Sequence, residues 1–301
     1  MTMNSIDEIQ NKDTSLQKLA AQRRAYSEAK RIFFIRSISA ICVAIAFPWL
    51  SESLPNLKNW FTAAAVLYIA VDFLLKKVES EKRTDGAKIQ EAFDCEVYGL
   101  RWNFFAAGGK PDGEVVGSYF VKVQRLGFES LKNWYPNNLS ELPVGVARTI
   151  CQRANIWWDS GLRIWYARLN LIILIVLSIC MLWVNKDKTV ASSIIFFASF
   201  VPLFKLLLEE YISHTESAKR LTELKQQLND QLDSVLTGGE VDEYASRSIQ
   251  DEIFRHRNSV TSIPNWFYGL LKNRYEKLMG FNAQEYVSKY TSTKVKRVFC
   301  G

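Results

Sequence analysis

The chain has 301 residues with a net charge of +7, and 48% of its residues are hydrophobic. Its five cysteines are scattered and its two histidines stand outside any HExxH motif, which excludes the short-spaced zinc motifs. Basic residues beside apolar segments account for much of the positive charge, so the excess requires no DNA or RNA polymer as a partner.

Four long apolar runs dominate the hydropathy pattern, at 32–50, 60–75, 169–184 and 190–208. Each has roughly 16–20 residues, which a helix extends over about 24–30 Å, close to the roughly 30 Å hydrocarbon core of a bilayer. The pattern predicts an all-α integral membrane protein, with four transmembrane helices in two hairpins and a mostly helical cytosolic domain. Four buried helices of a soluble protein are the alternative, but the third run has neither a charge nor a polar stripe.

Basic residues flank the outer ends of both predicted hairpins, whereas the short connection inside each hairpin holds few of them. The positive-inside rule therefore predicts that both termini and the middle of the chain are cytoplasmic. The predicted organisation is a cytosolic N-terminal helix (1–31), a first hairpin (32–75), a cytosolic middle module (76–168), a second hairpin (169–208) and a cytosolic C-terminal helical region (209–301).

The polar segments are also predicted to be mainly helical, because their apolar residues recur three or four positions apart. The predicted helices cover 11–30, 86–103, 209–236 and 244–260. Segment 104–127 stays open between a short strand and a buried loop. After Pro143, one helix is predicted to run into the third apolar run, with Gly161 as its weak point. The basic tail from Lys289 is predicted to be frayed.

Two segments, 150–163 and 247–257, combine arginines with other polar and aromatic side chains. At helical spacing their polar residues share a face, and acid–base pairs fall four residues apart. One interpretation is an intrahelical salt-bridge ladder with interfacial tryptophans. The other is an arginine-bearing seam that clamps phosphates and stacks bases on tryptophan. The residues of this candidate ligand-binding or coupling site are Gln152, Arg153, Asn155, Trp158, Asp159, Arg163, Arg247, Asp251, Arg255 and Arg257.

Three charged residues, Arg36, Asp72 and Lys205, fall inside or at the edges of apolar runs. A charge there is costly unless it is paired or hydrated. Asp72 and Lys205 are near the cytosolic ends, so snorkelling is one interpretation. The other is an ion path, or an intramembrane pair formed on assembly. Because four helices enclose only a narrow bundle, a conducting opening would form more easily between protomers, and we expect a homo-oligomer.

Four segments resemble a known bacterial family: AQRRAYSEAK (21–30), IQEAFDCEVYGLRWN (89–103), ICQRANIWWDSGLR (150–163) and RSIQDEIFRHR (247–257). In this order around two hairpins, they resemble the SMODS-associating four-transmembrane effectors, which are described as pore formers. The resemblance extends from about residue 21 to residue 268, and its motifs are distinctive only in combination.

The resemblance implies a role in cyclic-oligonucleotide-based anti-phage signalling. A neighbouring nucleotidyltransferase makes a cyclic oligonucleotide on infection, and the effector responds by damaging the membrane to arrest growth. The implied location is the bacterial inner membrane, as a multi-pass protein with cytoplasmic termini. The implied partners are the lipid bilayer and the cyclic oligonucleotide, with no other cofactor. No ligand-site residue is carried over from the family.

Two other functions fit the same predicted topology: a membrane-anchored receptor or scaffold, and a small constitutive channel. No Ser/His/Asp set, metal cluster or nucleotide-binding fingerprint stands out in the sequence. We therefore expect a protein that is not an enzyme, with no catalytic residues and no metal site.

Overall fold

The computed structural model describes residues 4–300, without the side chains of several positions between 44 and 66, of several between 191 and 202, and of 295–300. Within these residues the regular structure is helical, which confirms the all-α prediction. The α-helices are α1 (Ile6–Ile9), α2 (Asp13–Ser53), α3 (Lys58–Tyr98), α4 (Phe104–Ala107), α5 (Gly113–Phe120), α6 (Val144–Val184), α7 (Val190–Thr237), α8 (Glu243–Ser259) and α9 (Asn265–Cys300). Short 3₁₀ turns cover Pro55–Leu57, Gln124–Leu126 and Glu129–Leu131.

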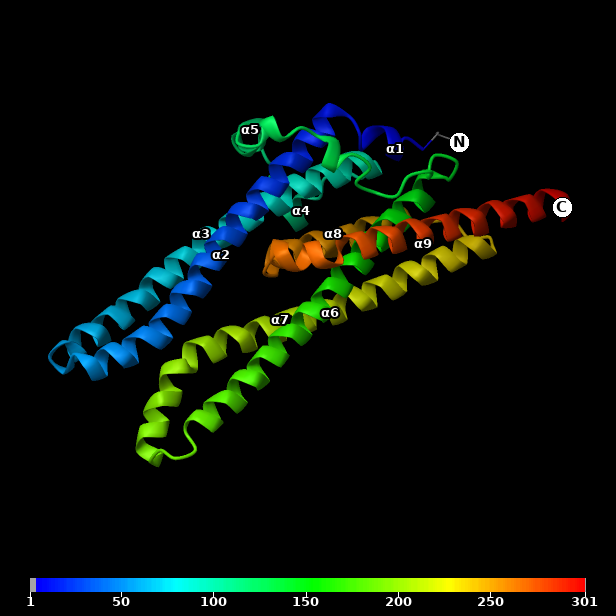
Figure 1. The fold of residues 1–301 in the computed structure, drawn as a ribbon. Coiled ribbons are helices and arrows are strands. Elements are labelled where there is room, and N and C mark those ends of the chain that lie inside the picture. Colours follow the sequence, from blue (N-terminus) through cyan, green and yellow to red (C-terminus); the bar gives the residue numbers. More distant parts are fainter. Residues whose placement is uncertain (1–3, 301) are drawn as a thin grey trace.

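The longest helices are paired as two hairpins. Figure 1 shows α2 packed along α3 and α6 packed along α7, with the two tips apart at the left and bottom of the view. Figure 1 also shows α8 and α9 between the inner parts of the two pairs. The hairpins therefore extend from one helical body, which holds both chain ends away from the tips.

Large apolar side chains are exposed on both hairpins, among them Trp60, Phe73, Ile179 and Trp183. Judged on the described residues alone, α6 is the one helix long and apolar enough to cross a membrane, with a mean hydropathy of 2.3 in its most apolar window. The helical hairpins are thus present, and the four membrane crossings stay a prediction.

Each of the four hairpin helices, α2, α3, α6 and α7, continues without a break between its apolar run and the body. α6 begins after Pro143, as predicted, and α7 ends just before Gly238. α3 ends earlier than predicted, at Tyr98, because Gly99 takes a left-handed conformation with φ of 65° and caps the helix.

Two local predictions are wrong. Segment 104–127 holds α4, α5 and a 3₁₀ turn in place of a strand or loop, because its apolar residues at Val115, Val116 and Tyr119 have helical spacing and pack on α2 and α3. The tail after Lys289 continues α9 and does not fray. Tyr286 and Tyr290 pack against the main core, which holds this helix against the body.

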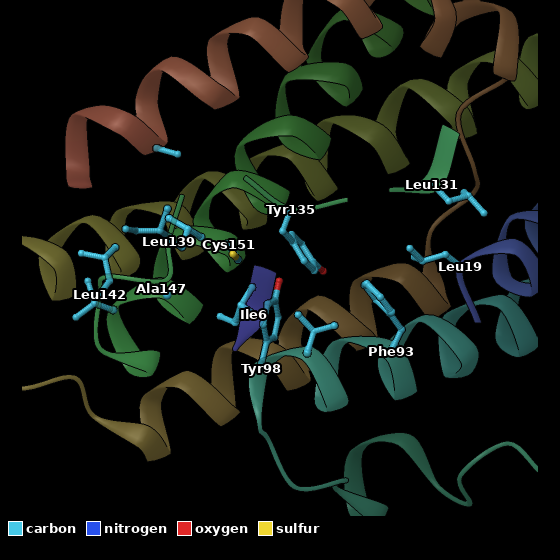
Figure 2. Packing of buried hydrophobic residues seen from close by; sticks show 14 of the residues in the cluster. Ile6, Leu19, Phe93, Tyr98, Leu131, Tyr135, Leu139, Leu142, Ala147 and Cys151 are labelled. Atoms are coloured by element: carbon cyan, nitrogen blue, oxygen red, sulfur yellow. The ribbon is translucent and has the colours of Figure 1, made fainter. Parts of the chain in front are cut away.

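The main hydrophobic core lies at the end of the body away from the hairpin tips. Figure 2 shows Phe93 and Tyr98 of α3 near Tyr135, with Ile6 of α1 and Cys151 of α6 in the same cluster. The segment between α5 and α6 contributes Leu131, Leu139 and Leu142. The core therefore fixes α3 of one hairpin to α6 of the other.

Gly161 does not break α6, and its small size has a packing role. A Cβ atom at this position would lie 2.5 Å from Oη and 2.7 Å from Cε1 of Tyr275 on α9. Tyr275 in turn packs against Trp157, with ring centroids 5.0 Å apart. Glycine here allows α9 to approach α6 closely.

We expect Gly161→Ala to lower the free energy of unfolding by about 1–3 kcal/mol through overpacking, despite the roughly 1 kcal/mol helix preference of alanine. Gly269→Ala is the matched control, because nothing lies within 4 Å of a Cβ built at Gly269. Thermal unfolding of the detergent-purified variants measures both effects. Equal stability of the two variants would contradict the packing role of Gly161.

Candidate functional site

Helix α8 lies between α3 and α6 and joins the two hairpins through polar side chains. Its apolar residues Ile249 and Ile253 pack on leucines of α7, in a cluster with Ile156 of α6. Several of its polar residues instead face α3 and α6, and four of them are buried: Ser246, Gln250, Asp251 and His256. We call this polar contact the charged seam; its members are Glu91, Asp94, Gln152, Asp159, Arg163, Arg247, Gln250, Asp251, His256 and Arg257.

Asp94 and Arg257 form the most deeply buried ion pair of the seam. Nη1 of Arg257 donates to Oδ2 of Asp94 at 2.6 Å, and the Asp94 side chain is fully buried. Asp94 also accepts hydrogen bonds from Oη of Tyr135 at 2.5 Å and from Nε2 of Gln250 at 3.0 Å. This carboxylate therefore connects α3, α8 and the main core.

A second group surrounds Arg247. Its Nη2 lies 2.6 Å from Oε1 of Glu91 and 2.7 Å from Oδ1 of Asp251. Burial raises the pKa of Glu91, and the nearby Asp94 carboxylate adds to this, while Arg247 acts in the opposite direction. Gln152 of α6 completes the contact by donating to the backbone oxygen of Ser246 at 3.0 Å.

The segment 256–261, which we call the clasp, binds both hairpins at once. On the α6 side, Nε2 of His256 is 2.5 Å from Oδ2 of Asp159, and Nη1 of Arg163 donates to the backbone oxygen of Thr261 at 3.2 Å. On the α3 side, Asn258 accepts hydrogen bonds from Nε of Arg83 at 3.1 Å and from Oγ1 of Thr84 at 2.7 Å.

Ion pairs continue from the clasp into the first hairpin. Nη1 of Arg83 lies 3.1 Å from Glu79, and Nη1 of Arg36 lies 2.5 Å from the same carboxylate. Nε of Arg36 is also 2.8 Å from Oδ1 of Asp72. Arg36 and Asp72 thus pair between α2 and α3 of one chain, whereas Lys205 is exposed and lies 3.7 Å from Glu209 on its own helix.

The sequence-predicted site residues divide into two sets. Gln152, Asp159, Arg163, Arg247, Asp251 and Arg257 meet in the charged seam. The intrahelical pairs Asp159–Arg163 and Arg247–Asp251 are present, at 3.0 and 2.7 Å.

The remaining predicted residues lie elsewhere. Arg153 donates from Nε to Asn229 at 2.6 Å and lies over the ring of Tyr286. Arg255 is exposed and pairs with Glu252 on its own helix, so the predicted ladder does not extend to it. Trp158 packs against Tyr268 and Tyr275, and Asn155 is half-buried on α6.

The seam also contains acidic partners that sequence reasoning missed, Glu91 and Asp94 of α3. A signal was present, because both carboxylates fall among the buried apolar positions Ile89, Phe93 and Val97 of a predicted helix. A carboxylate on a buried helical face requires a cationic or hydrogen-bonding partner. Over the described residues, no three His, Cys, Asp or Glu side chains gather as a metal site would require.

Two buried histidines, His256 of the clasp and His214 of α7, have lowered pKa values. Burial lowers the pKa of His256, Arg163 and Arg257 add to this, and Asp159 opposes it. Burial and Arg163 likewise lower the pKa of His214, against Glu210. Burial would raise the pKa of Asp159, but Arg163 and His256 outweigh it and hold that pKa well below its usual range.

We expect the protein to lose stability as the pH falls from about 7 to about 5. A histidine with a lowered pKa binds fewer protons in the folded state than in the unfolded state, so acid favours unfolding in this window. Asp159 contributes only at much lower pH, because its carboxylate stays charged. Unfolding temperatures at several pH values test this, and a His214→Gln/His256→Gln variant should have a flatter profile. An unchanged profile in that variant would reject the two histidines as the cause.

A cleft of about 910 Å³ opens beside the clasp, between α3 and α7. Residues of both hairpins line it, together with His256, Val260 and Thr261 of the clasp. The cleft is large enough for a ligand of drug size or more.

Residues 4–286 of the chain match a family model that is described as the SMODS-associating 4TM effector domain. A protein of Bacillus cereus (strain VD146), named a probable CBASS effector molecule, is 27% identical over 292 residues. That alignment covers 90% of this chain and 95% of the relative. No solved structure matches the chain.

Proposed function

Since this chain belongs to the SMODS-associating 4TM effector domain family, we propose that it is a membrane-embedded effector of CBASS anti-phage defence. On binding a cyclic oligonucleotide it oligomerises, permeabilises the bacterial inner membrane and arrests growth. The B. cereus relative, named a probable CBASS effector, supports the pathway. The membrane and coupling parts of the proposal rest on the hairpins and the seam.

The exposed apolar side chains of both hairpins carry the proposal. Trp60 is 73% exposed and Trp183 is 71% exposed, and isoleucines and leucines between the tips and the body are also exposed. Exposure of such apolar surfaces to water is strongly unfavourable, whereas the acyl chains of a bilayer would cover them. The proposed topology is therefore four crossings, with the seam, the clasp and both termini on the cytoplasmic side.

The charged seam would pass a cytosolic signal to both hairpins. α8 contacts α3 of the first hairpin through buried ion pairs and α6 of the second through hydrogen bonds to Gln152 and Asp159. Such polar contacts have discrete alternative pairings. A ligand shifts this equilibrium only by its differential affinity for the two states. About 5.5 kcal/mol would convert a mostly closed population into a mostly open one. Several protomers, each binding a ligand, would together supply it.

We also propose that the output is physical and not enzymatic. The carboxylates and arginines of the seam pair with one another, which stabilises helix packing but places them poorly for proton transfer to a substrate. One hairpin pair is too narrow to conduct, so the proposed opening lies between protomers.

In liposomes loaded with a self-quenching dye, we expect the purified full-length protein to release dye only when a cyclic oligonucleotide is added. A panel of cyclic dinucleotides and trinucleotides serves as the probe, and the linear forms are the control. Cells that make the active nucleotide should then lose their membrane potential, measured with a voltage-sensitive dye.

Release without any nucleotide would favour a constitutive channel. Nucleotide binding without release would favour a receptor or scaffold. A normal potential in cells that nevertheless stop growing would reject permeabilisation as the output.

A further inference from the structure

The cleft between the hairpins has an amphipathic lining. Phe33, Phe73 and Leu206 line it from the ends of three apolar runs, α2, α3 and α7 contributing one each. Lys76, Lys77 and Arg220 line it from the polar parts of α3 and α7. If the hairpins cross a bilayer, this boundary falls at the level of the lipid headgroups on the cytoplasmic side.

The cations of the cleft differ in their pairing. Arg36 and Arg83 are neutralised by Asp72 and Glu79. Lys76, Lys77 and Arg220 are exposed, and none of them makes an ion pair with the part of the chain that the structure describes.

The acidic residues of the lining leave a positive excess. Glu79 is paired with Arg36, and Glu209 lies near Lys205. Glu210 lies 3.2 Å from Nε2 of His214, a contact that does not cancel its charge unless the histidine is protonated. Glu216 is exposed and remains as the carboxylate nearest in the chain to Arg220. Three cations against the two carboxylates of Glu210 and Glu216 leave one net positive charge, which favours an anionic occupant.

We propose that this cleft binds an anionic phospholipid. Lys76, Lys77 and Arg220 contact the phosphate of its headgroup, and its acyl chains lie along Phe33, Phe73 and Leu206. Basic pockets between membrane helices on the cytoplasmic side suit anionic headgroups for this reason. A cyclic oligonucleotide offers the same phosphodiester chemistry, but its ribose rings gain nothing from the apolar end of the cleft.

The bound lipid would also contact the clasp and both hairpins, the elements whose relative movement the proposed function requires. His256 and Thr261 of the clasp line the same cleft. A lipid held there contacts α3, α7 and the clasp together, so its presence favours the arrangement of hairpins that the structure describes. The proposal depends on the membrane-crossing hairpins of the proposed function.

The test is native mass spectrometry of the full-length protein, purified in detergent and mixed with phosphatidylglycerol or with phosphatidylcholine of equal chain length. We expect one retained phosphatidylglycerol, bound at least tenfold more tightly than phosphatidylcholine. The triple variant Lys76→Ala/Lys77→Ala/Arg220→Ala should lower the affinity for phosphatidylglycerol by about tenfold to hundredfold. Leu206→Trp, which fills the apolar end without removing charge, should lower it as well.

Two control variants separate a cleft from general surface charge. Arg31→Ala/Arg168→Ala/Lys219→Ala removes three exposed cations of α2, α6 and α7 that lie outside the cleft, and should bind as the wild type does. Lys76→Arg/Lys77→Arg/Arg220→Lys keeps the charges and should retain the lipid. Equal losses in the two alanine triples would reject the proposal.

A nucleotide arm identifies the source of the phosphate. If a cyclic dinucleotide displaces phosphatidylglycerol one for one, and its own binding is lost in the cleft triple variant, the cleft is a nucleotide site and the lipid proposal is wrong. Simultaneous binding of phosphatidylglycerol and the cyclic dinucleotide supports the lipid proposal. If the wild-type chain does not float with vesicles, the proposed membrane topology is wrong. If it floats but binds the two lipids equally, the topology stands and only the lipid site in the cleft is rejected.

Discussion

Replacement of Arg257 by methionine is expected to lower the free energy of unfolding by about 3–5 kcal/mol, because it would leave Asp94 as an uncompensated buried charge. The two side chains are 10% and 0% exposed and lie 2.6 Å apart. Tyr135 and Gln250 would still donate to the carboxylate, but neither carries a positive charge. The loss is measured by chemical or thermal unfolding in detergent.

Arg255→Met is the matched control, two residues away on the same helix. Its side chain is 55% exposed and, among the side chains that the structure describes, forms its ion pair with Glu252 alone. We expect a change within about 0.5 kcal/mol, as for other exposed ion pairs. The double variant Asp94→Asn/Arg257→Met should recover much of the stability lost in Arg257→Met, because it removes both charges. Similar losses for the two arginines would contradict the burial argument.

The two arginines also illustrate what the sequence can predict. Helical spacing indicates which residues share a face and which acid–base pairs fall within one helix, and both Asp159–Arg163 and Arg247–Asp251 are present. Helical spacing does not show which residues of two helices distant in the chain lie opposite each other. Arg257 finds its partner 163 positions away, and nothing in the local pattern distinguishes it from Arg255.

Aromatic residues show the same limit. Trp158 was predicted either as an interfacial anchor or as a platform for a base. In the structure its ring centroid lies 5.8 Å from that of Tyr268 and 5.7 Å from that of Tyr275, both on α9. This contact requires the close approach that Gly161 allows, and it depends on a helix more than one hundred residues later in the chain.

The apolar runs were informative because their signal is local. A run long enough to cross a bilayer needs no knowledge of its partners, so the hairpins follow from composition and length alone. The charged seam depends on tertiary contacts, and only its arginine-rich half is visible in the sequence. The structure supplies the acidic half, on α3, and with it the connection between the hairpins.

That connection leads to the prediction with the largest effect on activity. The clasp binds α3 through Asn258 and α6 through His256, so separation of α3 from α6 at the level of the clasp must break one of the two contacts. If activation separates α3 from the clasp, a covalent link between Thr84 and Asn258 should prevent it. Their side-chain oxygens lie only 2.7 Å apart, within reach of a short bis(methanethiosulfonate), which joins two thiols through disulfides that a reductant can cleave.

We therefore expect Thr84→Cys/Asn258→Cys, cross-linked in a background with Cys42, Cys180 and Cys300 replaced by alanine, to lose nucleotide-dependent dye release almost completely. Reduction should restore the release, because without the cross-link the two substitutions remove only the hydrogen bond between Thr84 and Asn258. Gln226→Cys/Asp230→Cys is the control: it places the same link across one turn of α7, where it joins no separate elements. Full release from the cross-linked Thr84→Cys/Asn258→Cys protein would mean that α3 and the clasp move as one unit. The movement would then have to occur between the clasp and α6, where Asp159 lies 2.5 Å from His256 and Arg163 donates to the backbone oxygen of Thr261.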